Sequence, residues 1–352
     1  MKIVIATGPF IIGGGQVMIK NLVRRLKDDE IYVVCFGKRA DTQLSLEMEN
    51  LCGAHMIYID GNHLQRYLKF SRMMRRIKPD AMHAHLSGNQ YASLWTLFHK
   101  GHLISTMHTT PQKAYNARVE KIIRRLLKRR KCTCVAVSEK NHKESQAYFS
   151  ANDDRILFVN NGVEIADYYR EEHNTTTFIN VATHNENKNQ KAILYAFKRY
   201  YDEYPNSQLI LAGDGECHTA LKELSKELGI DDKVEFPGSV TNPEKYYAVA
   251  DIYVQSSHRE GMPLAVLEAM SAKLPIISTD VGGMRDIVQA NGILIPDNDI
   301  DALYQAMKTV ANNKEQYKKM QEESFKMVQK YSAEEMAKSY KEIYQARKLL
   351  WK

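Results

Sequence analysis

The chain lacks the features of a membrane-spanning, disulfide-bonded or secreted protein. Nowhere in its 352 residues do about 18 apolar residues follow one another, so we expect no spanning helix. Its 5 cysteines are an odd number, lie scattered and form no CxxC pair, which indicates neither a disulfide framework nor a zinc site. The N-terminal MKIVIATGPFIIGGG has no basic leader and no cleavage site, and it predicts a β-strand. We therefore expect a protein of the reducing cytoplasm.

What is present is enough apolar sequence for two buried sheets. Apolar residues make up 44% of the chain, and its length fits two domains of ordinary size. Short apolar runs alternate with helical patterns, which predicts parallel sheets with helices on both faces. The first half is expected to form strands at 2–7, 31–36, 54–59, 81–86, 102–107, 134–138 and 156–160. The second half is expected to form strands at 178–182, 207–213, 233–238, 251–256, 274–279 and 292–296.

The domain division follows from a polar, turn-rich segment at 167–177, which we interpret as a linker. It predicts a first Rossmann-like domain at 1–167 and a second at 168–332. The last helical stretch, 333–352, is expected to pack back on the first domain. The fold class is therefore α/β, with two doubly wound domains facing a central cleft, where ligands of such sheets usually bind.

Charge is divided unevenly between the two halves. Residues 1–165 contain 26 Lys and Arg against 14 Asp and Glu, a net charge of +12. The remaining residues carry a net charge of −5, which gives the +7 of the whole chain. The basic half is therefore the one expected to meet an anionic partner.

The most informative motif is SHREGMPLAVLEAM at 257–270. It predicts a strand end, a glycine turn at Gly261 and a helix that starts at Pro263. The amides at the start of such a helix, together with its dipole, bind phosphate oxygens without a basic side chain. Carboxylates such as Glu260 and Glu268 can accept hydrogen bonds from sugar or ribose hydroxyls. Spacing alone leaves open a surface helix with two solvated glutamates.

This stretch resembles the hallmark of retaining GT-B glycosyltransferases of family four, in which two glutamates frame seven residues. Further segments occur in the order and spacing of that family: LAGDGE (211–216), VEFPG (234–238), ADIYVQSS (250–257) and PIISTDVGG (275–283). The resemblance runs from the first glycine-rich loop to about Ile295, which is most of the chain. It implies the GT-B fold and a nucleotide-sugar donor.

The resemblance also implies roles for single residues. Glu260 matches the residue that holds the donor sugar, and Glu268 matches the ribose contact. Lys188, in NVATHNENKNQ, matches the lysine that neutralises the leaving diphosphate, where charge develops as the glycosidic bond breaks. The donor-binding set is completed by backbone positions and by one residue of the same loop: Thr183, Gly213, Gly261, Met262, Pro263 and Leu264.

One position departs from the family pattern. The family often has an arginine five residues before the lysine, and here that position is Thr183. The diphosphate would then depend more on Lys188 and on backbone amides. His184 beside it could contribute if protonated, or it could be a plain polar loop residue.

In the first half, the loop that follows strand 2–7 contains Gly13, Gly14 and Gly15 and opens a helix. Three glycines allow a ligand to approach the backbone closely, although a tight turn without a ligand fits as well. The resemblance places this loop near the donor diphosphate and the acceptor. It also places His108, in STMHTT, near the donor sugar. A structural histidine at a strand end is the alternative.

Two patterns suggest metal sites that we do not expect. His83 and His85 have the spacing of a strand-borne metal pair but lack a third ligand, so strand packing is favoured. Asp297, Asn298 and Asp299 form a DxD triplet, which binds metal in the other large glycosyltransferase fold. Here the triplet follows GILIP as a polar loop, so we expect no metal and no cofactor.

The stretch Arg118–Lys131 (RVEKIIRRLLKRRK) contains 8 Lys or Arg among its 14 residues. Its apolar residues have helical spacing, which suits a helix on an anionic membrane surface. A second basic helix contains Arg72, Arg75, Arg76 and Lys78. The alternative is an ordinary helix with a solvated basic face. No nucleic-acid-binding module accompanies it.

The resemblance implies a retaining glycosyltransferase that moves a hexose or N-acetylhexosamine from an NDP-sugar, expected to be a UDP-sugar. The expected acceptor is a glycan or a polyprenyl-linked intermediate of bacterial surface polysaccharide or glycolipid assembly, at the inner face of the plasma membrane. Two alternatives stay open: a sugar-nucleotide epimerase on the same scaffold, and a non-catalytic protein that only binds nucleotide-sugars.

Overall fold

The computed structural model describes residues 1–11, 13–165, 174–240 and 242–347. The chain divides into two compact units, each described by itself. Unit 1 comprises Met1–Gly162 and Ala333–Lys352, and unit 2 comprises Val163–Ser332. The predicted boundary between residues 167 and 168 lies in 166–173, outside the described residues.

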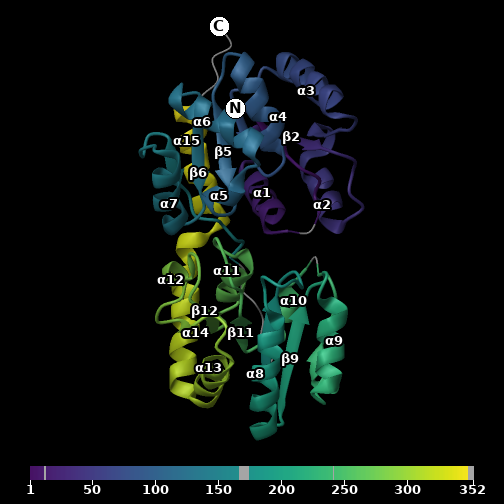
Figure 1. The fold of residues 1–352 in the computed structure, drawn as a ribbon, viewed down its shortest axis with the longest axis vertical. Helices are drawn as coiled ribbons and strands as arrows, with labels where there is room; N and C mark the ends of the chain where they lie inside the picture. The colour runs from purple at the N-terminus through teal and green to yellow at the C-terminus, as the bar shows by residue number, and fades with distance from the viewer. Residues whose placement is uncertain (12, 166–173, 241, 348–352) are drawn as a thin grey trace. The chain divides into compact units, whose positions relative to one another are not determined.

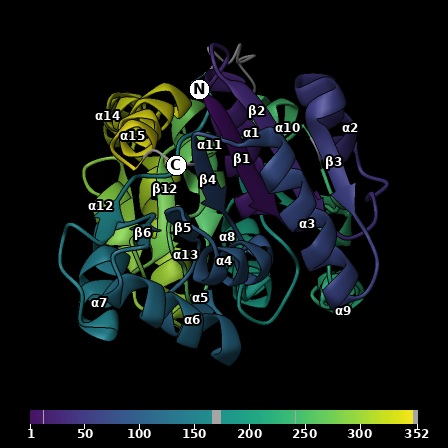
Figure 2. The same cartoon turned by 90° about the horizontal axis from the view of Figure 1, so that it is seen from above.

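Unit 1 is built on a seven-stranded parallel sheet in the order β3-β2-β1-β4-β5-β6-β7 (Figures 1 and 2). Each strand predicted in the first half appears, although β3 begins two residues late because a 3₁₀ turn at Gly53–His55 precedes it. The strands are β1 (Lys2–Thr7), β2 (Glu30–Phe36), β3 (Met56–Ile59), β4 (Ala81–Ala84), β5 (Leu103–Met107), β6 (Cys132–Ala136) and β7 (Ile156–Phe158).

Polar side chains cap the first turns of four helices of unit 1, namely α2, α3, α6 and α7. Asn62 and Gln65 form a reciprocal capping box at the start of α3, and Asn116 accepts the amide of Val119 at the start of α6. The helices of this part are α1 (Gly14–Arg25), α2 (Gln43–Cys52), α3 (His63–Ile77), α4 (Gly88–Phe98), α5 (Pro111–Ala114), α6 (Ala117–Lys128) and α7 (Glu139–Phe149).

The end of the chain returns to unit 1. Helix α15 (Ala333–Ala346) packs against α1, whereas the sequence predicted only that 333–352 returns to the first domain. Residues 348–352 lie outside the described part. Two fully buried tyrosines of α15 hold the helix on unit 1: Tyr340 hydrogen-bonds to Thr106 of β5, and Tyr344 hydrogen-bonds to His83 of β4.

Unit 2 contains a six-stranded parallel sheet in the order β10-β9-β8-β11-β12-β13. All six predicted strands appear; Thr176 and Thr177, expected in the linker, begin the first of them. The strands are β8 (Thr176–Val181), β9 (Ser207–Ala212), β10 (Val234–Glu235), β11 (Ile252–Gln255), β12 (Ile276–Thr279) and β13 (Gly292–Ile295). The helices are α8 (Gln190–Glu203), α9 (His218–Glu227), α10 (Glu244–Val249), α11 (Leu264–Ser271), α12 (Met284–Ile287), α13 (Ile300–Asn312) and α14 (Lys314–Val328), with short 3₁₀ turns at Asp231–Lys233 and Gln329–Tyr331.

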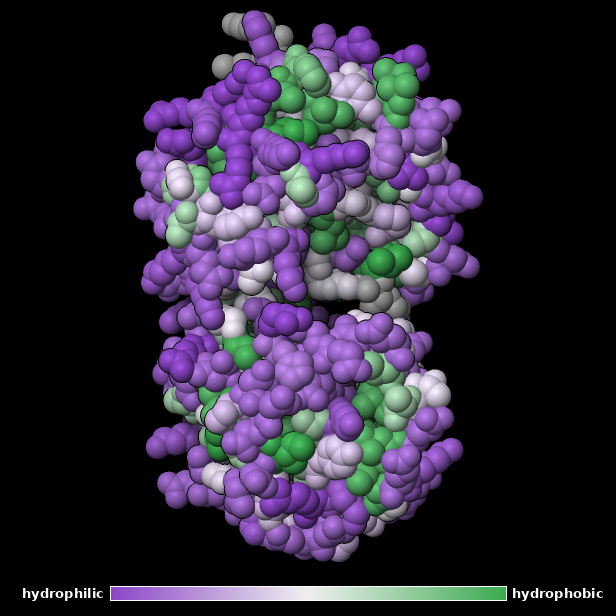
Figure 3. Space-filling model, viewed as in Figure 1, coloured by the Kyte–Doolittle hydropathy of each residue, from purple (hydrophilic) through white to green (hydrophobic). Residues whose placement is uncertain are grey.

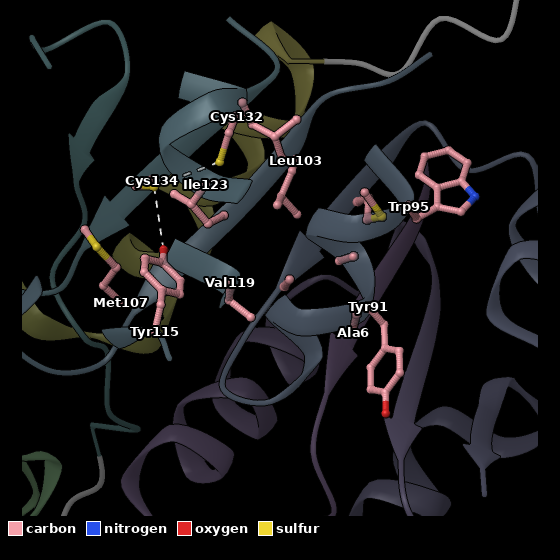
Figure 4. Packing of buried hydrophobic residues seen from close by; sticks show 14 of the residues in the cluster. Ala6, Tyr91, Trp95, Leu103, Met107, Tyr115, Val119, Ile123, Cys132 and Cys134 are labelled. Atoms are coloured by element: carbon pink, nitrogen blue, oxygen red, sulfur yellow. Dashed lines mark hydrogen bonds between the residues drawn. The ribbon is translucent and has the colours of Figure 1, made fainter. Parts of the chain in front are cut away.

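Each sheet is covered on both faces, as its continuous apolar strands require. In unit 1 the core includes Trp95, which is fully buried, and a polar contact in which the Tyr115 hydroxyl lies 3.6 Å from the Cys134 sulfur (Figure 4). In unit 2 the core gathers around Phe178, Phe197 and Tyr200, whose rings meet edge to face. Two separate cores therefore hold two independent sheets.

The face of each unit seen in Figure 3 is mainly hydrophilic. Within the described residues, every helix is too short or too polar to cross a membrane.

Candidate active site

In unit 2 the strand order reverses between β8 and β11, because β9 and β10 lie on one side of β8 whereas β11, β12 and β13 lie on the other. Ligands of open parallel sheets bind at such a reversal, outside the carboxyl ends of the strands. The two loops at this point are 182–189 and 256–263, and they are tied together. The amide of His258 donates to the Asn187 carbonyl over 2.8 Å, and the Ser256 hydroxyl donates to the Asn189 carbonyl over 2.8 Å.

These two loops bring Lys188 and Glu260 together. The Lys188 Nζ lies 2.6 Å from the Glu260 Oε1, across 72 residues of sequence. The Glu260 side chain is 8% exposed and that of Lys188 is 22% exposed. A carboxylate that is so nearly buried requires a paired cation. The residues predicted to contact the sugar and the diphosphate therefore form one charge-neutral pair.

Glycines allow the neighbouring loops to close on this site. Gly282, with φ of +59°, lies against the carbonyl of Glu260; a Cβ at this position would be 1.9 Å from that oxygen. The amide of Gly283 donates to the Gly261 carbonyl over 3.1 Å. On the other side, a Cβ at Gly213 would lie 1.8 Å from the Ala182 carbonyl oxygen. No side chain fits at either position, so backbone forms the walls.

Helix α11 begins directly after this turn. The predicted first helical residue, Pro263, is instead the N-cap with an extended backbone, so the helix starts one residue later at Leu264. A proline with ψ of 123° stands outside the helix, which explains the shift. Met262 is buried and Leu264 is buried, so they contribute backbone rather than side chains to the surface of the turn.

Glu268 lies one turn into α11. The hydroxyl of the fully buried Tyr247 lies 3.2 Å from both the Glu268 Oε2 and the Ala265 carbonyl oxygen, and these two acceptors share its single proton. This contact orients the Glu268 carboxylate. The sequence did not predict it, because Tyr247 lies on another helix, α10, 21 residues away. Both Glu260 and Glu268 raise the pKa of Tyr253, after the larger effect of its burial.

Thr183, at the position of the missing arginine, is exposed, and its carbonyl accepts a hydrogen bond from the Gln190 side chain. The neighbouring His184 is fully buried, and its Nδ1 lies 3.0 Å from the Nδ1 of His218. Burial, reinforced by His218, lowers the pKa of His184 to about 4. His184 is therefore neutral at pH 7 and does not replace the arginine's charge.

Unit 1 has its own reversal, between β1 and β4. Gly13 is the N-cap of α1, and Gly14 and Gly15 are its first residues. A Cβ at Gly15 would lie 3.5 Å from the Cγ of His108, so the predicted glycine loop and the predicted histidine are neighbours. His108 follows β5, and its Nε2 lies 3.0 Å from the Nδ1 of His85. Burial lowers the pKa of His108 to about 4.

The patterns that suggested metal sites have other partners. His83 is fully buried, and its ring nitrogens bond to the Tyr344 hydroxyl and the Thr106 hydroxyl, each over 2.7 Å. Asp299 caps α13, and Asp297 lies 2.8 Å from the Nδ1 of His258. Within the part of the chain that the structure describes, no group of three or more metal-ligating side chains occurs.

Known proteins resemble both units. The family described as Glycosyl transferases group 1 matches residues 164–327, and the family described as Glycosyltransferase Family 4 matches residues 12–167. Among curated proteins, the putative glycosyltransferase EpsD of Bacillus subtilis is 32% identical over 164 residues, which cover 46% of this chain and 43% of the relative. The N-acetyl-alpha-D-glucosaminyl L-malate synthase of Bacillus anthracis is 26% identical over 208 residues, 58% of this chain and 54% of the relative.

A solved structure with the same fold is Alr3699/HepE of Anabaena in complex with UDP-glucose. It superimposes with a TM-score of 0.84 at 16% identity and covers 98% of this chain and 100% of that one. Across four curated relatives, the alignments span only 28% to 54% of the relatives' lengths. The two family matches together run from residue 12 to residue 327 and meet where the two units meet. The chain belongs to the group 1 glycosyltransferases of the GT-B fold.

Proposed function

We propose that this chain transfers a hexose or N-acetylhexosamine from a UDP-sugar to a glycan or lipid-linked acceptor, with retention at the anomeric carbon. The observation that carries the proposal is the pair formed by Lys188 and Glu260 at the strand reversal of unit 2, enclosed by glycine turns. It combines a cation for a diphosphate with a carboxylate for sugar hydroxyls. The UDP-glucose complex of the Anabaena protein supports uridine as the base.

In this proposal Lys188 moves part of its hydrogen bonding from Glu260 to the diphosphate. An ammonium group has three donors, so it can keep one on the carboxylate while it neutralises the leaving group. The first amides of α11 take further phosphate oxygens, and Glu268, already held by Tyr247, accepts the ribose hydroxyls. Because Thr183 supplies no charge, Lys188 is the principal cation of the donor site.

Retention is proposed to occur by attack on the same face of the sugar from which the diphosphate leaves. The departing phosphate oxygen would accept the acceptor's proton, so the scheme needs no enzymic nucleophile. Among the residues discussed, Glu260 is held by Lys188 and is assigned to the sugar hydroxyls. The α-configured sugar in the name of the Bacillus anthracis relative supports this choice, since UDP-glucose is itself an α-glycoside.

A lipid-linked acceptor at an anionic membrane is supported by the exposed basic residues of α6, and not by its apolar residues. Its apolar residues Val119, Ile123, Leu126 and Leu127 are buried in unit 1, so they are not available for insertion into a bilayer. Four of its five basic residues are exposed, whereas Arg124 is half-buried against Tyr148. We therefore propose peripheral attachment through charge alone, at the cytoplasmic leaflet, where each basic residue near the surface contributes about 1 kcal/mol.

The donor assignment is tested by thermal shift with UDP, GDP and their sugars, with and without a chelator, followed by turnover with the sugars that bind. We expect UDP and UDP-sugars to raise the melting temperature in either condition. NMR of the product then reports the anomeric configuration. No shift with any nucleoside diphosphate would overturn the proposal, and conversion of a donor without acceptor would indicate an epimerase.

The membrane assignment is tested by cosedimentation with vesicles that contain or lack anionic lipid. Glutamine at Lys121, Arg125 and Lys128 is expected to weaken binding to anionic vesicles about a hundredfold. Equal binding to neutral vesicles, or no loss in this variant, would contradict the assignment. The matched control removes three exposed lysines from α14 of unit 2, namely Lys314, Lys318 and Lys319.

A further inference from the structure

At the strand reversal of unit 1, two histidines from neighbouring strands share one hydrogen bond. His85 follows β4 and His108 follows β5, and the Nδ1 of His85 lies 3.0 Å from the Nε2 of His108. The two rings have their centroids 5.2 Å apart. Only one proton can lie in this bond when both rings are neutral, so each ring determines which nitrogen of the other carries hydrogen.

The environment of His85 determines which of its two ring nitrogens carries the proton. It is fully buried, and its Nε2 has no hydrogen-bond partner among the described residues. Burial, followed by the neighbouring His83, lowers the pKa of His85 well below its usual range, so the ring is neutral at pH 7. A neutral imidazole keeps one N–H, and a buried N–H without an acceptor is costly. The proton therefore belongs on Nδ1, where His108 accepts it.

A rigid support holds His85 in this position. The ring of His83 lies against it, with centroids 3.9 Å apart. Both nitrogens of His83 are engaged, one with Tyr344 and the other with the Thr106 hydroxyl, which also contacts the hydroxyl of Tyr340 over 2.8 Å. The tyrosines of α15 therefore hold His83 in place, and His83 in turn packs against the ring of His85. The titratable groups packed around His85 are His83 and His108, with the α15 tyrosines beyond His83.

We infer that His85 is a positioning residue, which fixes the tautomer of His108 so that His108 presents a protonated Nδ1 beside the glycine loop. Since the Nε2 of His108 accepts from His85, its own proton must be on Nδ1. A Cβ added at Gly15 would lie 3.5 Å from the Cγ of His108 and 3.3 Å from the Leu86 side chain, so the backbone of the glycine loop lies next to the ring. His108 then donates a hydrogen bond to a substrate oxygen and does not act as a base.

The catalytic part of this inference rests on the proposed function, whereas the tautomer does not. The tautomer is read from the ligand-free protein by long-range ¹H–¹⁵N correlation on histidine-labelled protein, because protonated and unprotonated ring nitrogens resonate far apart. We expect His108 to show a protonated Nδ1 and an unprotonated Nε2. A protonated Nε2 would overturn the inference, whatever the enzyme's substrate.

Three variants separate positioning from folding. In His85→Asn the amide nitrogen can take the place of Nδ1, so we expect the His108 tautomer to be kept and kcat to fall no more than about threefold. In His85→Leu the donor is lost, and we expect kcat to fall about tenfold with little change in donor KM. The matched control is His102→Asn, a half-buried histidine before the same strand β5, which should leave kcat unchanged.

Equal kcat in the asparagine and leucine variants would refute the positioning role even if the tautomer is as expected. If the leucine variant does not fold, loss of kcat in the asparagine variant with a retained tautomer refutes it equally. Failure of every donor to react would instead count against the proposed function, because the tautomer measurement needs no donor.

Discussion

Replacing Lys188 with methionine removes the cation that lies 2.6 Å from Glu260 and leaves a carboxylate that is 8% exposed. At that distance, with an effective dielectric constant of about 20, the attraction is about 6 kcal/mol, and desolvation of the two charges offsets much of it. Breaking a fully buried pair costs about 3–5 kcal/mol. Because Lys188 is 22% exposed, we expect Lys188→Met to lower the free energy of unfolding by about 2–4 kcal/mol.

The pairing is isolated by a double-mutant cycle with Glu260→Gln. The double variant buries no unpaired charge, so we expect it to be more stable than Lys188→Met alone, with a coupling of about 2 kcal/mol. Urea unfolding followed by far-UV circular dichroism measures each corner of the cycle. The pair formed by Lys308 and Glu203 in the same unit is the control; both side chains are more than a third exposed, and we expect no measurable coupling there.

Activity should behave differently from stability in the same cycle. Each single variant is expected to lower kcat/KM about 10²–10³-fold, and the double variant should recover none of it, because the diphosphate and the sugar each lose a contact. If the changes in the free energy of unfolding of the two single variants were additive, the description of Lys188 and Glu260 as a coupled ion pair would be refuted. Full turnover in both single variants would refute the assignment of the site.

Three further predictions concern the walls of this site and the buried histidines. Gly282→Ala places a Cβ 1.9 Å from the Glu260 carbonyl at a φ of +59°, so we expect a lower melting temperature and loss of turnover, whereas an unchanged protein would show that the turn can move. Tyr247→Phe releases Glu268 and should raise the Kd for UDP a few-fold in calorimetry; no change would mean that the tyrosine does not orient the carboxylate. Burial lowers the pKa of His83 to about 3, so the unfolded chain binds more protons below pH 6.5, and the urea midpoint should fall steadily from about pH 6.5 to pH 4 and be restored on return to pH 7.

The order of elements could be predicted from the sequence because it depends on local patterns of apolar residues, glycine and proline. The place of the donor site is a further prediction from the same local patterns. Alternating apolar runs predicted every strand of the two sheets, and glycine followed by proline and an apolar helix predicted the turn at 260–264. The details at helix ends were less accurate. Pro263 proved to be a cap, and the basic stretch predicted as helical to Lys131 leaves the helix after Lys128.

Partners distant in sequence could not be predicted in this way. Lys188 and Glu260 are 72 residues apart, and His83 and Tyr344 are 261 apart. Such pairs meet because the sheet order places β8 beside β11 and because α15 returns to unit 1, and neither choice leaves a periodic signal. For the same reason, the spacing of His83 and His85 suggested a metal pair. In the tertiary structure His83 instead hydrogen-bonds to Tyr344, and His85 hydrogen-bonds to His108.

The sequence by itself determined the two-domain α/β architecture and the turn and helix start at 260–264, because hydrophobic periodicity, glycine turns and helix starts act within a few residues. Only the tertiary structure decided the pairing of charges and protons. It neutralised Lys188 with Glu260, and it buried the apolar side of α6 within its own unit. The physical reason is that burial and long-range contact depend on how strands order in the sheet, and these contacts decide which groups keep a charge.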